Sequence, residues 1–225
     1  TNNKSLKMKY IAIIPALKKN RYSKKGDLHS WGGSNLLEWK ISQVKKIKEI
    51  KKIYVSTPDK EIITECKKMN INCIFRKHKK NLSNFHYQIA KKFNNENLLF
   101  INTTSPFLSS SVIEKAIKKY KSLNKNYDSL CTVNKNKDYF FYKNKSINFD
   151  FEKSSVSRLL LKPLVKLTNG LYIINSRICL RKKNIIGDKP FFFELDWMSG
   201  LEINSLKDIG IYNLLINYYF EKDKR

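Results

Sequence analysis

Short apolar runs alternate with amphipathic stretches along the first two thirds of the chain. The runs are continuous in Ile, Val, Leu and Phe rather than alternating with polar residues, which is typical of strands buried on both faces of a sheet. They predict strands at 10–16, 52–57, 73–76, 97–102 and 129–133. Apolar residues at helical spacing predict helices at 36–49, 60–69, 85–93 and 112–120, the last capped by Ser110 or Ser111. Because helices separate the strands, we expect crossover connections and a mostly parallel sheet.

The pattern changes near Asn134. Two short runs flank Lys143 to Lys145 and predict an antiparallel hairpin within an insertion at about 134–166. Beyond it we expect strands at 169–174, 191–194 and 200–203, a helix at 176–183, and a last helix capped by Ser205 and ending near 221. The fold class is therefore α/β, with a mixed, mostly parallel sheet flanked by helices and a small antiparallel insertion. We expect one domain over residues 1–225, with 1–7 as an extension or linker because Met8 resembles a natural start.

Composition excludes several classes of protein. Hydrophobic residues make up 41% of the 225 residues, enough for a sizeable core. The four cysteines include no C-x-x-C pair, which argues against a zinc site and against a secreted disulfide framework. The apolar run from Tyr10 to Leu17 is short and contains a proline, so we expect no membrane insertion and a cytoplasmic location.

The formal net charge is +26, which raises the alternative of a nucleic-acid binder. The lysines, however, are spread along the whole chain on expected helix faces, without a basic tail or an RNP or zinc-finger pattern. This distribution favours a solvated surface, and nucleic acid is an unlikely partner. The three histidines share no spacing with one another and are expected to be incidental.

The stretch from Ile11 to Trp39 carries the first functional signal. An apolar strand ends at Pro15, a loop with many lysines and Arg21 follows, and Gly32-Gly33 leads into a helix. In parallel sheets, ligands bind at the carboxyl ends of the strands. We therefore expect the loops at 17–33, 76–84 and 102–107 to open onto one site for an anionic ligand.

Several short motifs follow one another in a recognisable order. They are Ile14-Pro15-Ala16, Val55 to Asp59 (VSTPD), Ile101 to Phe107 (INTTSPF), Tyr127 to Leu130 (YDSL), Asn148 to Asp150 (NFD), Asn169 to Ile173 (NGLYI) and Gly200 to Asp208. In this order they resemble the acylneuraminate cytidylyltransferase family, the CMP-sugar synthetases, from residue 11 to about 215. The resemblance implies a Rossmann-like nucleotide-diphospho-sugar transferase fold, in which the insertion caps the sugar site and contributes to a homodimer. It also implies transfer of CMP from CTP to an acidic sugar of the nonulosonic, sialic type or a related anionic acceptor, with release of pyrophosphate.

The same resemblance implies roles for individual residues. Arg21 and Lys25 are expected to be catalytic. The expected nucleotide-binding residues are Ala16, Leu17, Asn20, Arg21, Lys25, Asp27, Arg76 and Ser83. The expected substrate-binding residues are Asn102, Thr104, Ser105, Arg158 and Asn169. Mg²⁺ is the expected cofactor, held by Glu202, Asn204 and Asp208.

Among the departures from the family pattern, three bear on turnover. Leu17 replaces an arginine, Gly26 stands where a lysine is usual, and Asn204 replaces an aspartate. Asn204 can supply an oxygen to a metal but no charge. These departures keep open the alternative of a catalytically degenerate paralogue that binds nucleotide or sugar without turnover. A 3-deoxy-octulosonate or a phosphonate is an alternative acceptor.

Overall fold

A seven-stranded sheet forms the centre of the structure, a computed structural model that describes residues 9–77, 82–150 and 157–223. In sheet order the strands are β11 (Pro190–Glu194), β7 (Ser129–Asn136), β10 (Leu164–Asn175), β6 (Asn97–Ile101), β1 (Tyr10–Pro15), β4 (Ile50–Thr57) and β5 (Asn72–Phe75). Within this sheet only β10 runs antiparallel to its neighbours. The predicted mixed, mostly parallel sheet is confirmed.

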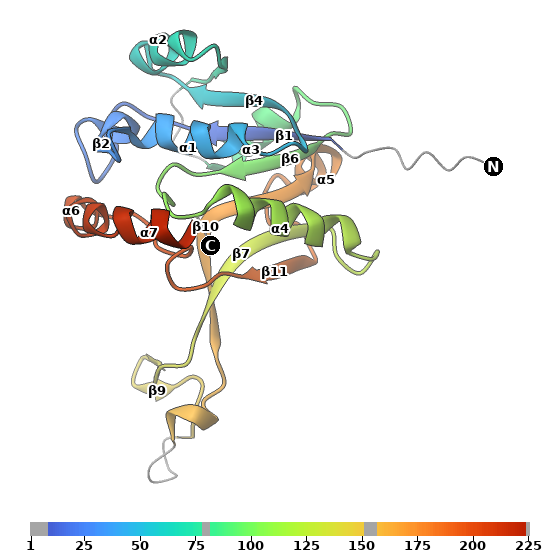
Figure 1. The fold of residues 1–225 in the computed structure, drawn as a ribbon. Coiled ribbons are helices and arrows are strands. Elements are labelled where there is room, and N and C mark those ends of the chain that lie inside the picture. Colours follow the sequence, from blue (N-terminus) through green and yellow to red (C-terminus); the bar gives the residue numbers. More distant parts are fainter. Residues whose placement is uncertain (1–8, 78–81, 151–156, 224–225) are drawn as a thin grey trace.

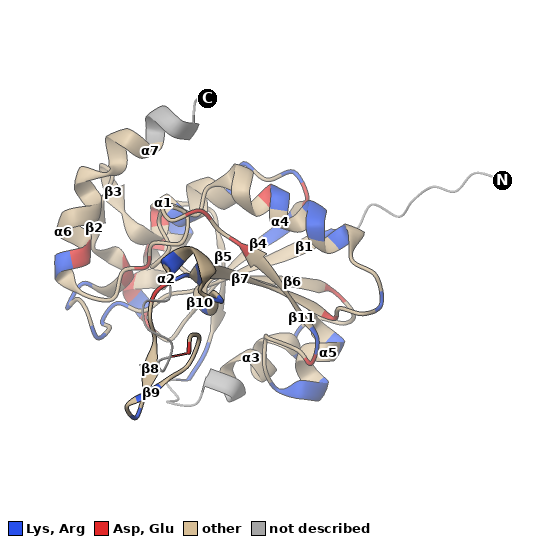
Figure 2. Ribbon diagram, turned by 90° about the horizontal axis from the view of Figure 1, so that it is seen from below, with Lys and Arg blue, Asp and Glu red and all other residues tan. Residues whose placement is uncertain are grey.

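Helices cover both faces of the sheet (Figures 1 and 2). One face is covered by α1 (Leu36–Lys45), α2 (Lys60–Lys68) and α4 (Ser110–Ser122), and the other by α3 (Leu82–Ala90) and α5 (Ser176–Lys182). The last two helices, α6 (Leu206–Leu214) and α7 (Ile216–Asp223), pack with α1 around a third, aromatic cluster. The fold is therefore the predicted α/β class, with three layers.

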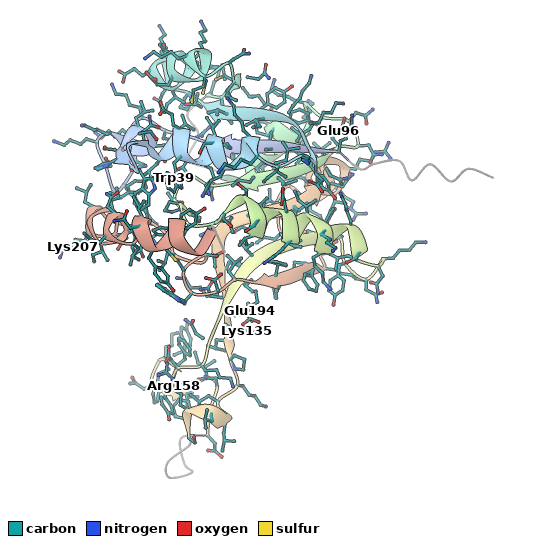
Figure 3. The ribbon with its side chains drawn as sticks, viewed as in Figure 1. Trp39, Glu96, Lys135, Arg158, Glu194 and Lys207 are labelled. Carbon is teal, nitrogen blue, oxygen red and sulfur yellow. The ribbon has the colours of Figure 1, made fainter. Side chains whose placement is uncertain are left out.

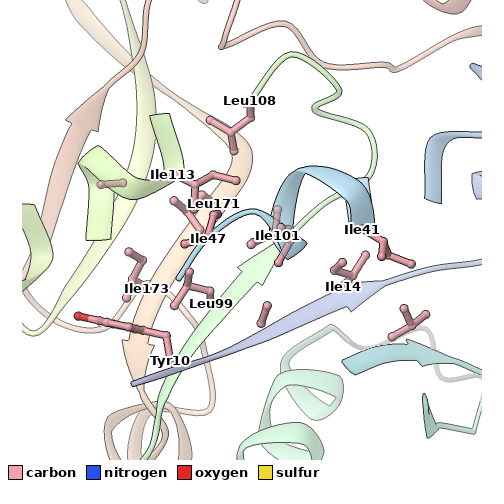
Figure 4. Close-up of a cluster of buried hydrophobic side chains, with 14 of the residues drawn as sticks. Tyr10, Ile14, Ile41, Ile47, Leu99, Ile101, Leu108, Ile113, Leu171 and Ile173 are labelled. Carbon is pink, nitrogen blue, oxygen red and sulfur yellow. The ribbon is translucent and has the colours of Figure 1, made fainter. Parts of the chain in front are cut away.

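Burial of β1 on both faces explains its continuous apolar sequence. Tyr10, Ala12 and Ile14 face the α1 side, whereas Ile11 and Ile13 face the α3 side. Figure 4 shows Ile14 in the cluster that also contains residues of β6 and β10. Fully burying one such aliphatic side chain stabilises a fold by roughly 1.5–3 kcal/mol, so two-sided burial makes β1 the anchor of the sheet.

The Gly-Gly turn after the cationic loop forms a small ribbon. Strands β2 (Ser30–Trp31) and β3 (Ser34–Asn35) pair around Gly32 and Gly33, whose φ angles are +54° and +80°. A Cβ at Gly32 would lie 2.5 Å from the ring of Trp39, so the turn needs glycine there. The side chain of Asn35 then accepts a hydrogen bond from Glu38 N and begins α1.

Three details of the later chain correct the expectations. Ser109, rather than Ser110 or Ser111, caps α4 by accepting a hydrogen bond from Val112 N. The segment 200–203 is not a strand, because Ile203 N donates to Thr104 O instead of joining a ladder. The final helix is divided at Leu215, although Ser205 caps its first half as predicted.

An arm projects from the sheet within the region expected as an insertion (Figure 1). Strands β7 and β10 continue beyond the sheet as a two-stranded ribbon, with Leu164 opposite Asn136. The ribbon carries the hairpin of β8 (Phe141–Tyr142) and β9 (Lys145–Ser146) and the short helix η2 (Arg158–Leu160). The hairpin turn has positive φ at Lys143 and Asn144, which matches the right-handed twist of its strands.

Basic residues occur on helices of both faces and in the arm (Figure 2). This distribution agrees with the expectation of a generally basic surface. Among the described residues, no helix combines the length and the apolar character that a membrane crossing requires.

Candidate active site

A cavity of about 600 Å³ opens where β1 and β6 end, at the carboxyl edge of the parallel strands. Its walls come from the cationic loop, from Arg76 after β5, from α3, from the turn after β6, from β10, from residues 184–186 after α5 and from the segment before α6. Ten of the predicted site residues line it: Ala16, Leu17, Asn20, Arg21, Asp27, Arg76, Asn102, Thr104, Asn169 and Glu202. Segments distant in the sequence therefore meet at the edge where α/β sheets bind ligands.

Backbone amides of the loop after β1 are hydrogen-bonded to side chains of the protein itself. Leu17 N donates to Asp27 Oδ2 at 2.6 Å, and Lys18 N donates to Asp59 Oδ2 at 2.8 Å. Farther along, Asn20 Oδ1 accepts from Ser23 N at 2.9 Å. Two carboxylates thus bind the amides at the end of β1, a place that often binds an external anion. In this conformation, an anionic ligand must rely on side-chain cations more than on loop amides.

Asp27 joins the loop to the turn that follows the central strand β6. Its carboxylate is 5% exposed, and its Oδ1 accepts hydrogen bonds from Tyr22 OH at 2.8 Å and from Thr103 Oγ1 at 2.6 Å. Burial raises the pKa of Asp27, and the hydrogen bonds it accepts oppose that rise. Asp27 was predicted to bind nucleotide, but its oxygens are directed at protein donors. Its observed contacts hold the loop, and no local sequence pattern indicated Tyr22 or Thr103 as its partners.

Two arginines, Arg21 and Arg76, line the cavity and supply positive charge. Arg21 Nη2 donates to Asn204 Oδ1 at 2.5 Å, which links the loop to the segment before α6. The guanidinium of Arg76 lies 4.8 Å from the ring centroid of Phe85, and burial lowers the pKa of Arg76. Guanidinium groups suit phosphate and carboxylate oxygens because they offer two parallel donors.

Amide and hydroxyl groups and the carboxylate of Glu202 add polar surface to the cavity. Asn102 Nδ2 donates to Asn169 O at 2.6 Å, and Tyr172 OH donates to Asn169 Oδ1 at 2.6 Å. Asn169 has a φ of +50°, in the left-handed region that asparagine tolerates better than most residues. Glu202 lies beside it, and burial raises the pKa of the Glu202 carboxyl. Amides and a carboxylate on one wall suit a ligand with several hydroxyl groups.

Residues that the sequence did not single out line the inner end of the cavity. Phe85, His86 and Tyr172 contribute aromatic surface there. Burial lowers the pKa of His86 to about 4, so its imidazole is neutral at neutral pH. His86 was expected to be incidental, and no spacing between histidines could have indicated this place, because α3 alone brings it to the cavity.

Lys25, Ser105 and Arg158 were also predicted for the site, but the described structure does not place them in the cavity lining. Lys25 is exposed, and its N donates to Ser23 Oγ at 3.0 Å. Ser105 is buried behind the turn. Arg158 lies in the arm, where it pairs with Asp138 and donates from Nε to Lys137 O at 3.0 Å (Figure 3). Ser83 lies in the first turn of α3, and its side chain is outside the described part of the structure.

The predicted metal ligands divide into different roles. Glu202 lines the cavity, whereas the amide oxygen of Asn204 accepts from Arg21. Asp208 Oδ2 accepts from Asn204 N and Ser205 N, both at 2.7 Å, and completes a capping box at the start of α6. Over the described residues, no group of three or more His, Cys, Asp or Glu side chains could hold a metal ion. Glu202 fits Mg²⁺ as a single carboxylate, because Mg²⁺ sites often combine one or two carboxylates with phosphate oxygens and water.

Comparison with known proteins gives one family and one fold. The sequence profile of the cytidylyltransferase family matches residues 11–187. No curated protein matches the sequence. A similar solved structure is 4-diphosphocytidyl-2C-methyl-D-erythritol synthase from Anaerococcus prevotii, with a TM-score of 0.69, 16% identity, and coverage of 94% of this chain and 99% of that one. Another is CMP:2-keto-3-deoxy-manno-octonic acid synthetase in complex with CTP, with a TM-score of 0.68, 9% identity, and coverage of 93% and 99%.

Proposed function

The chain belongs to the cytidylyltransferase family, and we propose that it transfers the cytidylyl group of CTP to a hydroxyl group of an anionic sugar acid. The observation that carries the proposal is the cavity, whose lining combines the cations Arg21 and Arg76 with Asn102, Asn169 and Glu202. The two guanidinium groups suit a triphosphate. The amides and the carboxylate suit a polyhydroxylated acceptor.

In the proposed reaction, the acceptor hydroxyl oxygen attacks the α-phosphorus of CTP. A new P–O bond forms, the bond between the α-phosphorus and the oxygen bridging to the β-phosphorus breaks, and pyrophosphate leaves. The hydroxyl proton passes to solvent or to a carboxylate. The guanidinium of Arg21 neutralises negative charge on the phosphates of CTP. The side chains of Asn102 and Asn169 orient the acceptor.

Mg²⁺ remains the cofactor we propose. Glu202 would hold it together with triphosphate oxygens, and the ion would supply positive charge where negative charge develops. Asp208 is assigned to the cap of α6 rather than to the ion, because both of its contacts to the backbone depend on the same carboxylate oxygen.

The acceptor class is proposed as a nonulosonic, sialic-type acid, with a 3-deoxy-octulosonate as the nearest alternative. The similarity in fold to a synthetase for 2-keto-3-deoxy-manno-octonic acid supports including the second acceptor. A phosphonate would also present a negatively charged group to the cavity, as a sugar acid does. A panel of acceptors therefore has to contain all three.

A degenerate paralogue that binds CTP without turnover is the second candidate. It is favoured by the loop amides of Leu17 and Lys18, which are bound to the side chains of Asp27 and Asp59. It is also favoured by the metal site, because Glu202 alone of the three predicted metal ligands lines the cavity. Such a protein would bind the nucleotide through Arg21 and Arg76 and would release no pyrophosphate.

A homodimer assembled through the arm is proposed as well. Leu159 and Leu160 of η2 are 83% and 77% exposed, and they lie next to each other at the end of the arm. Two large apolar side chains exposed together on a projecting ribbon favour contact with another protein surface. In a dimer, Arg158 of this helix could reach a site other than that of its own subunit.

Pyrophosphate release separates the two candidates. The purified protein is incubated with CTP and Mg²⁺ and with each acceptor in turn, and CTP binding is measured in parallel by calorimetry. Acceptor-dependent release of one pyrophosphate per CTP supports the transferase. CTP binding without release for every acceptor supports the paralogue, and absence of CTP binding overturns both.

A further inference from the structure

Three side chains of α1 donate hydrogen bonds to backbone carbonyls at the turn that follows β6. Trp39 Nε1 donates to Pro106 O at 2.7 Å, and Gln43 Nε2 donates to the same oxygen at 2.9 Å. Lys40 Nζ donates to Ser105 O at 2.8 Å and to Leu108 O at 3.1 Å. The turn is therefore held by its backbone carbonyls, from one face of one helix.

Lys40 is the unusual member of this set. Its side chain is 0% exposed, and its third hydrogen bond goes to Gln43 Oε1 at 2.6 Å. The three N–H groups of an ammonium thus meet three oxygens, none of them from a carboxylate. In the described part of the chain, Lys40 has no acidic partner, and burial lowers its pKa to about 7. A buried cation without a counter-charge is costly, so general stability is a poor explanation for it.

The turn that Lys40 holds is the meeting point of the cavity walls. Thr103 reaches Asp27 of the loop, and Asn102 Nδ2 reaches Asn169 O of β10. Thr104 O accepts from Ile203 N at 2.8 Å, beside Glu202. A shift of this turn would therefore move its contacts with the cationic loop, with β10 and with the segment before α6, all of which line the cavity.

We propose that Lys40 is a positioning residue, which sets the place of the 102–104 wall and of Glu202 by binding the carbonyls of the turn behind them. The assignment rests on the proposed function only for its effect on turnover. Lys40 touches no part of the cavity, so its action passes through the backbone of residues 104–108 and through the Thr104–Ile203 hydrogen bond.

The test compares Lys40→Met, which keeps the length of the side chain but offers no donors, with Lys46→Met at the exposed end of the same helix. Amide hydrogen exchange of the protein alone is measured at Ile203 and, as an internal reference in β1, at Ile13. Lys40→Met is expected to raise the exchange rate at Ile203 at least tenfold more than at Ile13. A residue that only stabilises the whole fold would raise both rates by the same factor, and that result would overturn the proposal.

Turnover provides the second readout. In Lys40→Met we expect kcat for pyrophosphate release to fall at least tenfold while KM for CTP changes less than threefold, because Arg21 and Arg76 remain in place. For Lys40→Arg, which keeps the charge, kcat is expected to lie between the values for the wild type and for Lys40→Met. Lys40→Arg replaces Lys40→Met in both measurements if Lys40→Met does not fold. Absence of turnover in the wild type would end the proposed function, whereas the exchange comparison would still decide the role of Lys40.

Discussion

Thr103 Oγ1 donates a hydrogen bond of 2.6 Å to the buried carboxylate of Asp27, across 76 positions of sequence. This contact holds the cationic loop against the turn that follows the central strand. Asp27→Asn keeps the shape of the side chain but turns one acceptor into a donor that faces other donors. We expect a loss of about 2 kcal/mol in the free energy of unfolding, measured by urea titration.

The matched control for this variant is Asp188→Asn. Asp188 is exposed and pairs with Lys182 at 2.6 Å, and such surface pairs contribute about 0.5 kcal/mol. Equal losses in the two variants would mean that the Asp27 contacts do not anchor the loop.

Arg21 is expected to dominate the binding of CTP. Arg21→Ala should raise the Kd for CTP at least tenfold, or about 1.4 kcal/mol, because a charge-assisted contact to phosphate is lost. Lys46→Ala removes the same charge from the far end of α1 and should change the Kd less than twofold. Calorimetric titration measures the Kd for CTP of both variants. Equal changes would mean that the loop is only a charged surface and does not bind the nucleotide specifically.

Glu202 and Asp208 are expected to separate metal binding from stability. In Glu202→Gln, the strengthening of CTP binding by Mg²⁺ should largely disappear, because the carboxylate that faces the cavity is gone. In Asp208→Asn, that dependence should persist, while the free energy of unfolding falls by about 1 kcal/mol through the weakened cap of α6. Titrations of CTP with and without Mg²⁺, together with urea unfolding, check the pair. If the Mg²⁺ dependence of CTP binding disappears in Asp208→Asn and persists in Glu202→Gln, Asp208 is the metal ligand.

His86 should make stability depend on pH in the acid range. The folded state keeps its imidazole neutral down to about pH 4, whereas the unfolded chain protonates it near 6.5. Its contribution is therefore present above pH 6.5 and is lost as the pH falls towards 4, by roughly 3 kcal/mol at most. In His86→Leu the unfolding free energy should fall less steeply between pH 7 and 4. Parallel pH curves for the two proteins would contradict this prediction.

The arm is expected to carry the subunit contact. Replacing both Leu159 and Leu160 with Asp should lower the molar mass measured by light scattering from that of a dimer to that of a monomer. Leu214→Asp on α6 is the control, since Leu214 is 81% exposed but lies away from the arm. A wild-type protein that is monomeric at high concentration would end this proposal.

Elements that local pattern determines were predictable from the sequence. The two-sided burial of β1 left a continuous apolar run, and Ser205 with Asp208 has the spacing of a capping box. The same cap engages Asp208, which the family pattern aligns with a metal ligand. The resemblance also located most of the cavity, because its motifs follow the carboxyl ends of the strands.

Contacts between distant segments were not predictable in the same way. Nothing near Lys40 in sequence indicates that its partners lie 65 and 68 residues away. The segment 200–203 is apolar enough for a strand, but its backbone is engaged by Thr104. His86 reaches the cavity only because α3 packs beside it. Each of these outcomes depends on tertiary packing rather than on a pattern within one element.

In the loop after β1, Leu17 N is bound to the carboxylate of Asp27 and Lys18 N to the carboxylate of Asp59. These contacts affect the affinity for ligands. A ligand that uses these amides must select conformations in which Asp27 or Asp59 has withdrawn. Its apparent dissociation constant is then the intrinsic constant divided by the population of those open conformations. A protein with one open loop in a hundred would bind such a ligand about a hundredfold more weakly than its contacts alone would allow. Removing Asp59 from this exchange would raise affinity without adding a single contact to the ligand.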